Sequence, residues 1–66
     1  MSAPAARHAA QFGTLLRLAR TRHRLTRKEA AWRISPMLSW RTLEDWETGR
    51  RVPPEWLQGI ILAKMA

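Results

Sequence analysis

The absence of cysteine is the feature that most limits how this chain of 66 residues can fold. A chain of this length is near the lower size limit for a domain that folds alone, and it can form neither a disulfide nor a thiolate zinc site. Small domains without such cross-links rely on well-packed helices or on oligomerisation. Because 45% of the residues are hydrophobic, the chain can still build one compact core. We therefore expect a single small domain.

The excess positive charge of the chain lies entirely in its first half. The 12 Lys and Arg residues outnumber the 5 Asp and Glu residues, which gives a net charge of +7. Residues 1–33 contain eight of the cations and a single acid, whereas residues 34–66 contain four cations and four acids. An excess of this size indicates a polyanionic partner, and we predict nucleic acid. Ten of the cations are Arg, whose guanidinium suits bidentate contacts with phosphates and base edges.

Residues 9–23 show the spacing of an amphipathic helix. An apolar face at i, i+3, i+4 and i+7 is formed by Phe12, Leu15, Leu16 and Ala19. A second face, which we predict to be exposed, carries Arg17, Arg20 and Arg24. These cations either lie on a solvated surface or approach a polyanion that relieves their mutual repulsion. The small residues at 1–8 are interpreted as a flexible arm, which either frays or contacts DNA.

A short second helix is predicted over residues 27–34. Thr26 and Glu29 have the spacing of a capping box, in which each side chain accepts a hydrogen bond from the other residue's backbone amide. Ala31 is small enough to let another helix cross this one closely. Pro36 disfavours helical backbone at the residue before it, so we expect the helix to end there.

A third helix is predicted over residues 40–48. Ser39 stands at its N-cap, and Gly49 follows its last residue as a C-terminal glycine. Leu43 and Trp46, three residues apart, would face the core. Glu47 would lie at the edge of this face. The side chains left to point outward would be those of Trp40, Arg41, Glu44, Asp45 and Thr48.

A fourth helix is expected to begin at Pro53 and Pro54, because proline is tolerated in the first turn of a helix. Its apolar side chains surround much of its circumference, so one face can enter the core while the rest would be exposed on a monomer. Trp56 could belong to either side. Together the four segments predict an all-α bundle of four to five short helices over residues 9–66. We predict a dimer surface formed by Trp56, Ile61, Leu62 and Met65.

A capped short helix with a small residue, a break, and a second capped helix that ends in glycine together outline a helix-turn-helix. Three segments match a known sequence pattern: Leu25-Thr26-Arg27-Lys28-Glu29-Ala30-Ala31, Ser39-Trp40-Arg41-Thr42-Leu43 and Trp46-Glu47-Thr48-Gly49-Arg50-Arg51, with Pro53 just beyond. They resemble the Cro/repressor-type helix-turn-helix family, also called the XRE family, over about residues 12–63. The turn between Ile34 and Ser39 is longer than the family pattern and lacks its glycine. In this the chain is similar to the phage anti-CRISPR-associated repressors, which autoregulate their operons.

The resemblance implies a transcriptional regulator, an autoregulating repressor that binds an inverted-repeat operator in double-stranded DNA as a homodimer. Residues 40–48 would lie in the major groove, with base edges read by Trp40, Arg41, Glu44 and Asp45. Contacts with phosphates are implied for Arg27, Lys28, Ser39, Thr48, Arg50 and Arg51. From the residues alone, Arg41 and Asp45 could instead pair with each other across one helical turn, and Glu44 could serve only solubility.

Two other function classes fit parts of the sequence. An antitoxin-like or adaptor module could use the apolar fourth helix to bind another protein, and a non-specific basic protein could coat DNA or RNA. Glu44 and Asp45 argue against a non-specific nucleic-acid-coating protein, since acids weaken binding to phosphate. The sequence offers no nucleophile–base pair, phosphate loop or metal cluster, and His8 and His23 are too isolated to be metal ligands. We expect no enzyme, cofactor, metal or small-molecule effector. Without a signal peptide or membrane span, we expect a cytoplasmic protein.

Overall fold

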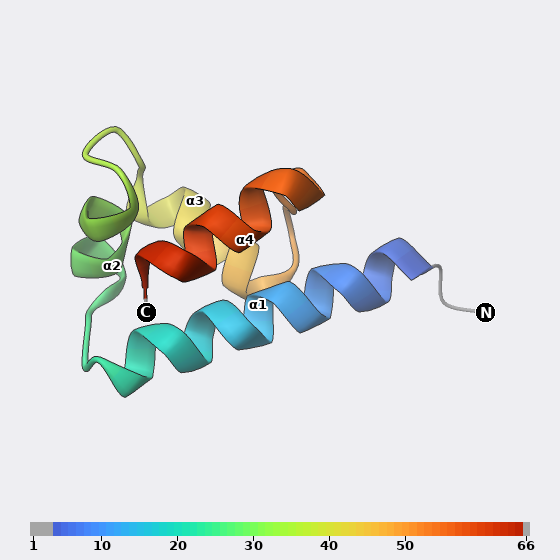
Figure 1. The fold of residues 1–66 in the computed structure, drawn as a ribbon, viewed down its shortest axis with the longest axis horizontal. Coiled ribbons are helices and arrows are strands. Elements are labelled where there is room, and N and C mark those ends of the chain that lie inside the picture. The colour runs from blue at the N-terminus through green and yellow to red at the C-terminus, as the bar shows by residue number, and fades with distance from the viewer. Residues whose placement is uncertain (1–3, 66) are drawn as a thin grey trace.

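Four helices make up the described part of the chain in the computed structural model, which gives the backbone of residues 4–65 and the side chains of residues 11–65. They are α1 (Pro4–Arg22), α2 (Arg27–Ile34), α3 (Trp40–Thr48) and α4 (Glu55–Lys64). The long α1 runs along one side of the molecule, and the three shorter helices gather over its middle and C-terminal part (Figure 1). The expected all-α class is confirmed. None of the described helices is long and apolar enough to cross a membrane.

The N-terminal helix begins earlier than its apolar pattern predicts. α1 starts at Pro4, whereas the spacing of hydrophobic residues indicates a start near residue 9. Proline at the first helical position lacks only an amide that would have no partner there, and the alanines that follow favour helix. The helix therefore extends into the segment predicted as a flexible arm, of which residues 1–3 lie outside the described residues.

The short helices α2 and α3 begin at the caps that the sequence predicts. The Thr26 hydroxyl accepts a hydrogen bond from the Glu29 amide at 3.1 Å, and the Glu29 carboxylate accepts one from the Thr26 amide at 2.8 Å. The bond from the Thr26 amide is the main reason that the pKa of Glu29 lies below its usual value. At α3 the Ser39 hydroxyl accepts from the Arg41 amide at 3.1 Å, and Gly49 ends the helix in the left-handed conformation, with φ of 78°.

The longer connection between α2 and α3 contains a hydrogen-bonded tight turn. The Leu38 amide donates to the Ser35 carbonyl oxygen at 3.0 Å, and Pro36 occupies the second position of this turn, where its fixed φ is favoured. The Nζ atom of Lys64, at the end of α4, donates to the Ile34 carbonyl oxygen at 2.9 Å. That bond satisfies one of the C-terminal carbonyl groups of α2. The extra residues are thus accommodated without the glycine that the family pattern places in this turn.

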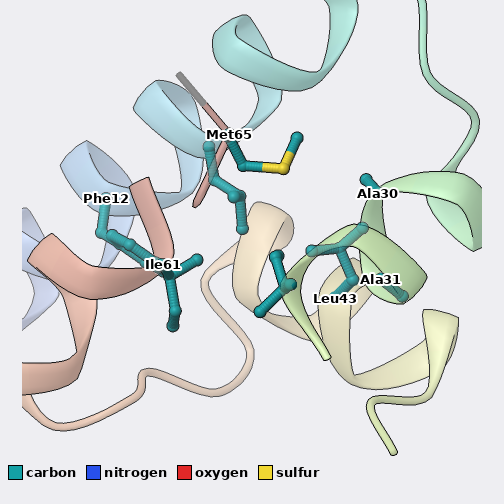
Figure 2. Packing of buried hydrophobic residues seen from close by; sticks show 8 residues of the cluster. Phe12, Ala30, Ala31, Leu43, Ile61 and Met65 are labelled. Carbon is teal, nitrogen blue, oxygen red and sulfur yellow. The ribbon is translucent and has the colours of Figure 1, made fainter. Parts of the chain in front are cut away.

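All four helices contribute to one hydrophobic core (Figure 2). Trp46, which we predict to face the core, is half-buried and packs against it. Its ring meets that of Phe12 edge-on, with the ring centroids 6.4 Å apart. Leu15, which shares the apolar face of α1, is 48% exposed and lines a crevice between α1 and α4. The buried hydrophobic residues that form this core are Phe12 and Leu16 of α1, Ala30, Ala31 and Ile34 of α2, Leu43 of α3, and Ile61 and Met65 at the C-terminal end.

Helices α1 and α3 approach each other so closely at Gly13 that no side chain fits between them. A Cβ atom there would lie 2.6 Å from the carbonyl oxygens of both Trp46 and Glu47. These oxygens belong to the C-terminal half of α3, so the backbone of α1 rests directly on that end of the helix. By contrast, a Cβ atom at Gly59 of α4 would meet nothing within 4 Å.

The two glycines provide a matched test of this helix contact. Gly13→Ala forces a methyl group against backbone oxygens that cannot move aside, and we expect it to lower the free energy of unfolding by about 1–3 kcal/mol. Gly59→Ala enters open space in a helix and should raise that free energy by about 0.5–1 kcal/mol. Urea unfolding followed by circular dichroism measures both. Equal stabilisation by the two substitutions would contradict the close approach of α1 and α3.

Candidate nucleic-acid interface

The first turns of α2 and α3 meet at a basic hollow on the surface. It is lined by the N-cap Thr26 with Arg27 and Lys28 of α2, by Trp40 of α3, and by Arg20 of α1. The structure therefore brings predicted phosphate-binding residues next to a predicted base-reading residue.

Trp40 and Arg41, the first two residues of α3, are exposed and stack on each other. The Cζ atom of Arg41 lies 5.5 Å from the centroid of the Trp40 ring, the geometry of a cation–π contact. The alternative ion pair between Arg41 and Asp45 is not formed. Asp45 is paired instead with Arg51 in the loop after α3, with Nε and Oδ2 3.7 Å apart.

A buried carboxylate at the other end of α3 fixes three helices to one another. The side chain of Glu47 is only 2% exposed, and it accepts hydrogen bonds from Arg20 Nε at 2.6 Å and Arg20 Nη2 at 3.2 Å. Arg27 adds a longer contact from its Nε atom at 3.5 Å. The remaining Nη1 atom of Arg20 donates to the Leu25 carbonyl oxygen at 3.0 Å, so the loop before α2 is held as well.

The prediction that Arg20 lies on an exposed arginine face was wrong. Its side chain is 13% exposed, because the buried carboxylate of Glu47 requires a cation beside it. Helical spacing placed Arg20 with Arg17 and Arg24, and only knowledge of which helix crosses α1 separates it from them. The sequence does contain one signal of this pairing. Glu47 is a carboxylate in the last turn of a short helix with an apolar face, and a carboxylate in that position needs a cation beside it.

All three acids of α3 have arginine partners from other parts of the chain. Glu44 lies 3.4 Å from Arg27, measured from Oε2 to Nη1, and both side chains are about half exposed at 42% and 40%. Glu47 is paired with Arg20 and Asp45 with Arg51, as described above. Arg41 is the remaining charged side chain of α3, and it lies on an aromatic ring instead. The helix therefore presents an arginine, with its acids already neutralised.

The other predicted phosphate contacts surround α3 at both ends. Lys28 is exposed at the start of α2, and Arg50 and Arg51 are exposed in the loop after α3. The hydroxyl groups of Ser39 and Thr48 are engaged inside the chain: Ser39 caps α3, and Thr48 donates to the Glu44 carbonyl oxygen at 3.0 Å. The three cations are thus better placed than the two hydroxyls to reach a phosphate.

The predicted dimer surface was wrong for Ile61 and Met65. Both are buried in the core. Leu57, Ile61 and Met65 follow one another at intervals of four residues, and this face of the C-terminal segment packs against the rest of the domain. Leu62 is half-buried. The sequence left open whether Trp56 lies in the core or on the surface. It is 72% exposed, so it lies on the surface.

One comparison with known proteins gives a match. The model of a family described as a helix-turn-helix domain matches residues 11–63, a stretch that contains α2, α3 and nearly all of α4. No curated protein and no solved structure matches the chain.

The buried pair of Arg20 and Glu47 can be tested by removing one partner. Arg20→Met leaves a buried carboxylate with only the longer contact from Arg27, and we expect a loss of about 3 kcal/mol in unfolding free energy. Arg17→Met changes an exposed arginine one turn earlier and should cost no more than about 0.5 kcal/mol. Guanidinium unfolding followed by tryptophan fluorescence compares them. Similar values for the two variants would show that the pair does not hold α1 to α3.

Proposed function

The chain belongs to a helix-turn-helix domain family, and from this membership we propose that it is a sequence-specific regulator of transcription. It binds double-stranded DNA with the first turn of α3 in the major groove. The observation that carries the proposal is the exposed pair of Trp40 and Arg41 at that turn, with Lys28 lining the hollow beside Trp40 and with Arg50 and Arg51 exposed after the other end of α3. The net charge of +7 supports a polyanionic partner.

We assign base reading first to Arg41. An arginine in the major groove binds the O6 and N7 atoms of guanine with two hydrogen bonds, and this contact is worth about 1–3 kcal/mol of discrimination. Glu44 and Asp45 could accept a hydrogen bond from a cytosine amino group only by giving up Arg27 and Arg51. Their contribution to base reading is therefore secondary in this proposal.

Phosphate binding is assigned to Lys28, Arg50 and Arg51, with the N-terminal amides of α2. Two of the arginines are shared between this role and ion pairs within the chain: Arg27 also contacts Glu44 and Glu47, and Arg51 also contacts Asp45. These cations lie near the two ends of α3. They would hold the domain on the backbone while α3 reads the bases.

The regulator is proposed to be an autoregulating repressor that acts as a homodimer on an inverted repeat. Its half-sites lie one helical turn apart, roughly 34–36 Å. The contact between protomers uses Trp56 and Ile60, which are one turn apart on α4 and are both exposed. Trp32 is equally exposed on α2, but its neighbours one turn earlier are the charged Lys28 and Glu29, so it forms no comparable apolar face.

A protein-interaction module is the second candidate function. Met37 in the turn before α3 is 92% exposed, and it lines an apolar hollow together with Leu57 and Ile60 of α4. Another protein could bind there without DNA. Such binding would change little between low and high salt, whereas DNA binding weakens steeply.

Two arginine variants separate base reading from phosphate binding. On duplexes selected from a randomised pool, Arg41→Ala should lose preference at one base pair and bind the selected and altered duplexes alike. Arg50→Ala should weaken binding to all sequences equally and reduce the slope of log affinity against log salt by about one unit. Fluorescence anisotropy at several salt concentrations measures both effects. A wild-type chain that selects no consensus and binds every duplex equally would refute sequence-specific binding.

The dimer contact is tested at Trp56, with Trp32 as the matched control. We expect the wild-type chain to bind an inverted repeat as two protomers, cooperatively. Trp56→Ser should remove that cooperativity while leaving binding to one half-site intact, and Trp32→Ser should change neither. Sedimentation equilibrium with and without the duplex gives the stoichiometry. A chain that stays monomeric at high micromolar concentration, both free and on the duplex, would contradict the dimer.

A further inference from the structure

The stacked pair of Trp40 and Arg41 carries more information than either residue alone. The two occupy the first two positions of α3, and both are exposed. The guanidinium carbon of Arg41 lies 5.5 Å from the centroid of the Trp40 ring, so the two flat groups are neighbours before any DNA arrives. An aromatic ring on one side of an arginine restricts where the guanidinium can point, and restriction before binding favours affinity.

The surroundings of the pair leave this stack undisturbed. The two nearest acids of α3 that could draw Arg41 away are Glu44 and Asp45, and they are paired with Arg27 and Arg51. Trp40 also lines the hollow at the start of α2, where phosphate binding is proposed. The indole is therefore placed between a backbone anchor and the base-reading arginine.

Geometry decides what the indole meets when Arg41 binds guanine. A guanidinium that makes two hydrogen bonds to O6 and N7 lies in the plane of the guanine. The Cζ atom of Arg41 lies over the face of the Trp40 ring, 5.5 Å from its centroid. This distance exceeds the spacing of about 3.4 Å between neighbouring base pairs, so the indole reaches beyond the level of the guanine to that of the adjacent pair. At that level the indole faces the major-groove edge of the neighbouring base.

The bases differ in what they present to an apolar ring at this place. Adenine, guanine and cytosine present polar atoms, which lose hydrogen bonds to water when indole carbons cover them. Thymine presents a methyl group on C5, and 5-methylcytosine carries the same group. An indole gains from burying that methyl group and gains nothing comparable from the others.

We propose that Trp40 and Arg41 together read one two-base step: a guanine bound by Arg41, next to a base pair whose C5-methyl group packs against the indole of Trp40. The inference rests on the proposed DNA binding by α3. It adds that a single methyl group, rather than a hydrogen bond, sets the preference at the position beside the guanine.

The experiment removes only that methyl group from the selected duplex. Replacing the neighbouring thymine by deoxyuridine should weaken wild-type binding by about three- to five-fold. Replacing it by cytosine should weaken binding too, and 5-methylcytosine should recover a similar factor over cytosine. The comparison of thymine with deoxyuridine and that of 5-methylcytosine with cytosine thereby test the methyl group on each of the two bases that can carry it. Fluorescence anisotropy at fixed salt gives the ratios.

Two protein variants show which residue senses the methyl group. Trp40→Ala should bind the thymine and deoxyuridine duplexes equally, whereas Trp32→Ala should keep the wild-type ratio. Equal binding of the two duplexes by the wild-type chain would overturn the inference, as would an unchanged ratio in Trp40→Ala. A chain that selects a sequence yet ignores the methyl group contradicts this inference alone. A chain that selects no sequence contradicts the proposed function, and this inference with it.

Discussion

The buried carboxylate of Glu47 is the interaction on which the arrangement of the helices depends. A charge removed from water must be compensated, and Arg20 of α1 does so with two hydrogen bonds while Arg27 of α2 adds a third contact. Gly13 lets the backbone of α1 lie directly against the same end of α3. The C-terminal end of α3 is thus held by polar and steric contacts from two helices. Its N-terminal end, capped by Ser39, is free to present side chains to a partner.

The charges of the chain therefore have two different tasks. The surplus in the first half suggests a uniform surface for phosphates, yet Arg20 and Arg27 neutralise acids of α3. Arg51, from the half without net charge, does the same for Asp45. What remains uncommitted on α3 is Arg41, supported by an aromatic ring. A helix that enters the groove of a polyanion gains from such internal pairing, because unpaired acids would repel the phosphates.

The sequence predicts the local features well and the choice between helix faces poorly. The bounds of α2 and α3, the capping box, Ser39 and Gly49 follow from contacts within a few residues, so they can be recognised without knowing the fold. The fate of Arg20, Leu15, Ile61 and Met65 depends on which helix crosses which. In α4, where apolar residues surround the axis, helical period alone could not separate the buried Ile61 from the exposed Trp56. Gly13 illustrates the same limit, since its lack of a side chain has meaning only against α3. For the candidate site, the candidate residues come from the sequence, and their pairing comes from the fold.

The central claim is that the first turn of α3 is the surface that meets DNA. The most direct test is an NMR titration of the isotopically labelled chain with its selected duplex. The largest changes in chemical shift are expected for the backbone amides of Trp40 and Arg41 and for the indole N–H of Trp40. Smaller shifts are expected at Lys28 and Arg50, where phosphates would bind. Shifts concentrated around Met37 and Leu57, with the signals of Trp40 and Arg41 unchanged at saturation, would contradict the account. They would indicate that the apolar hollow beside α4 is the binding surface instead.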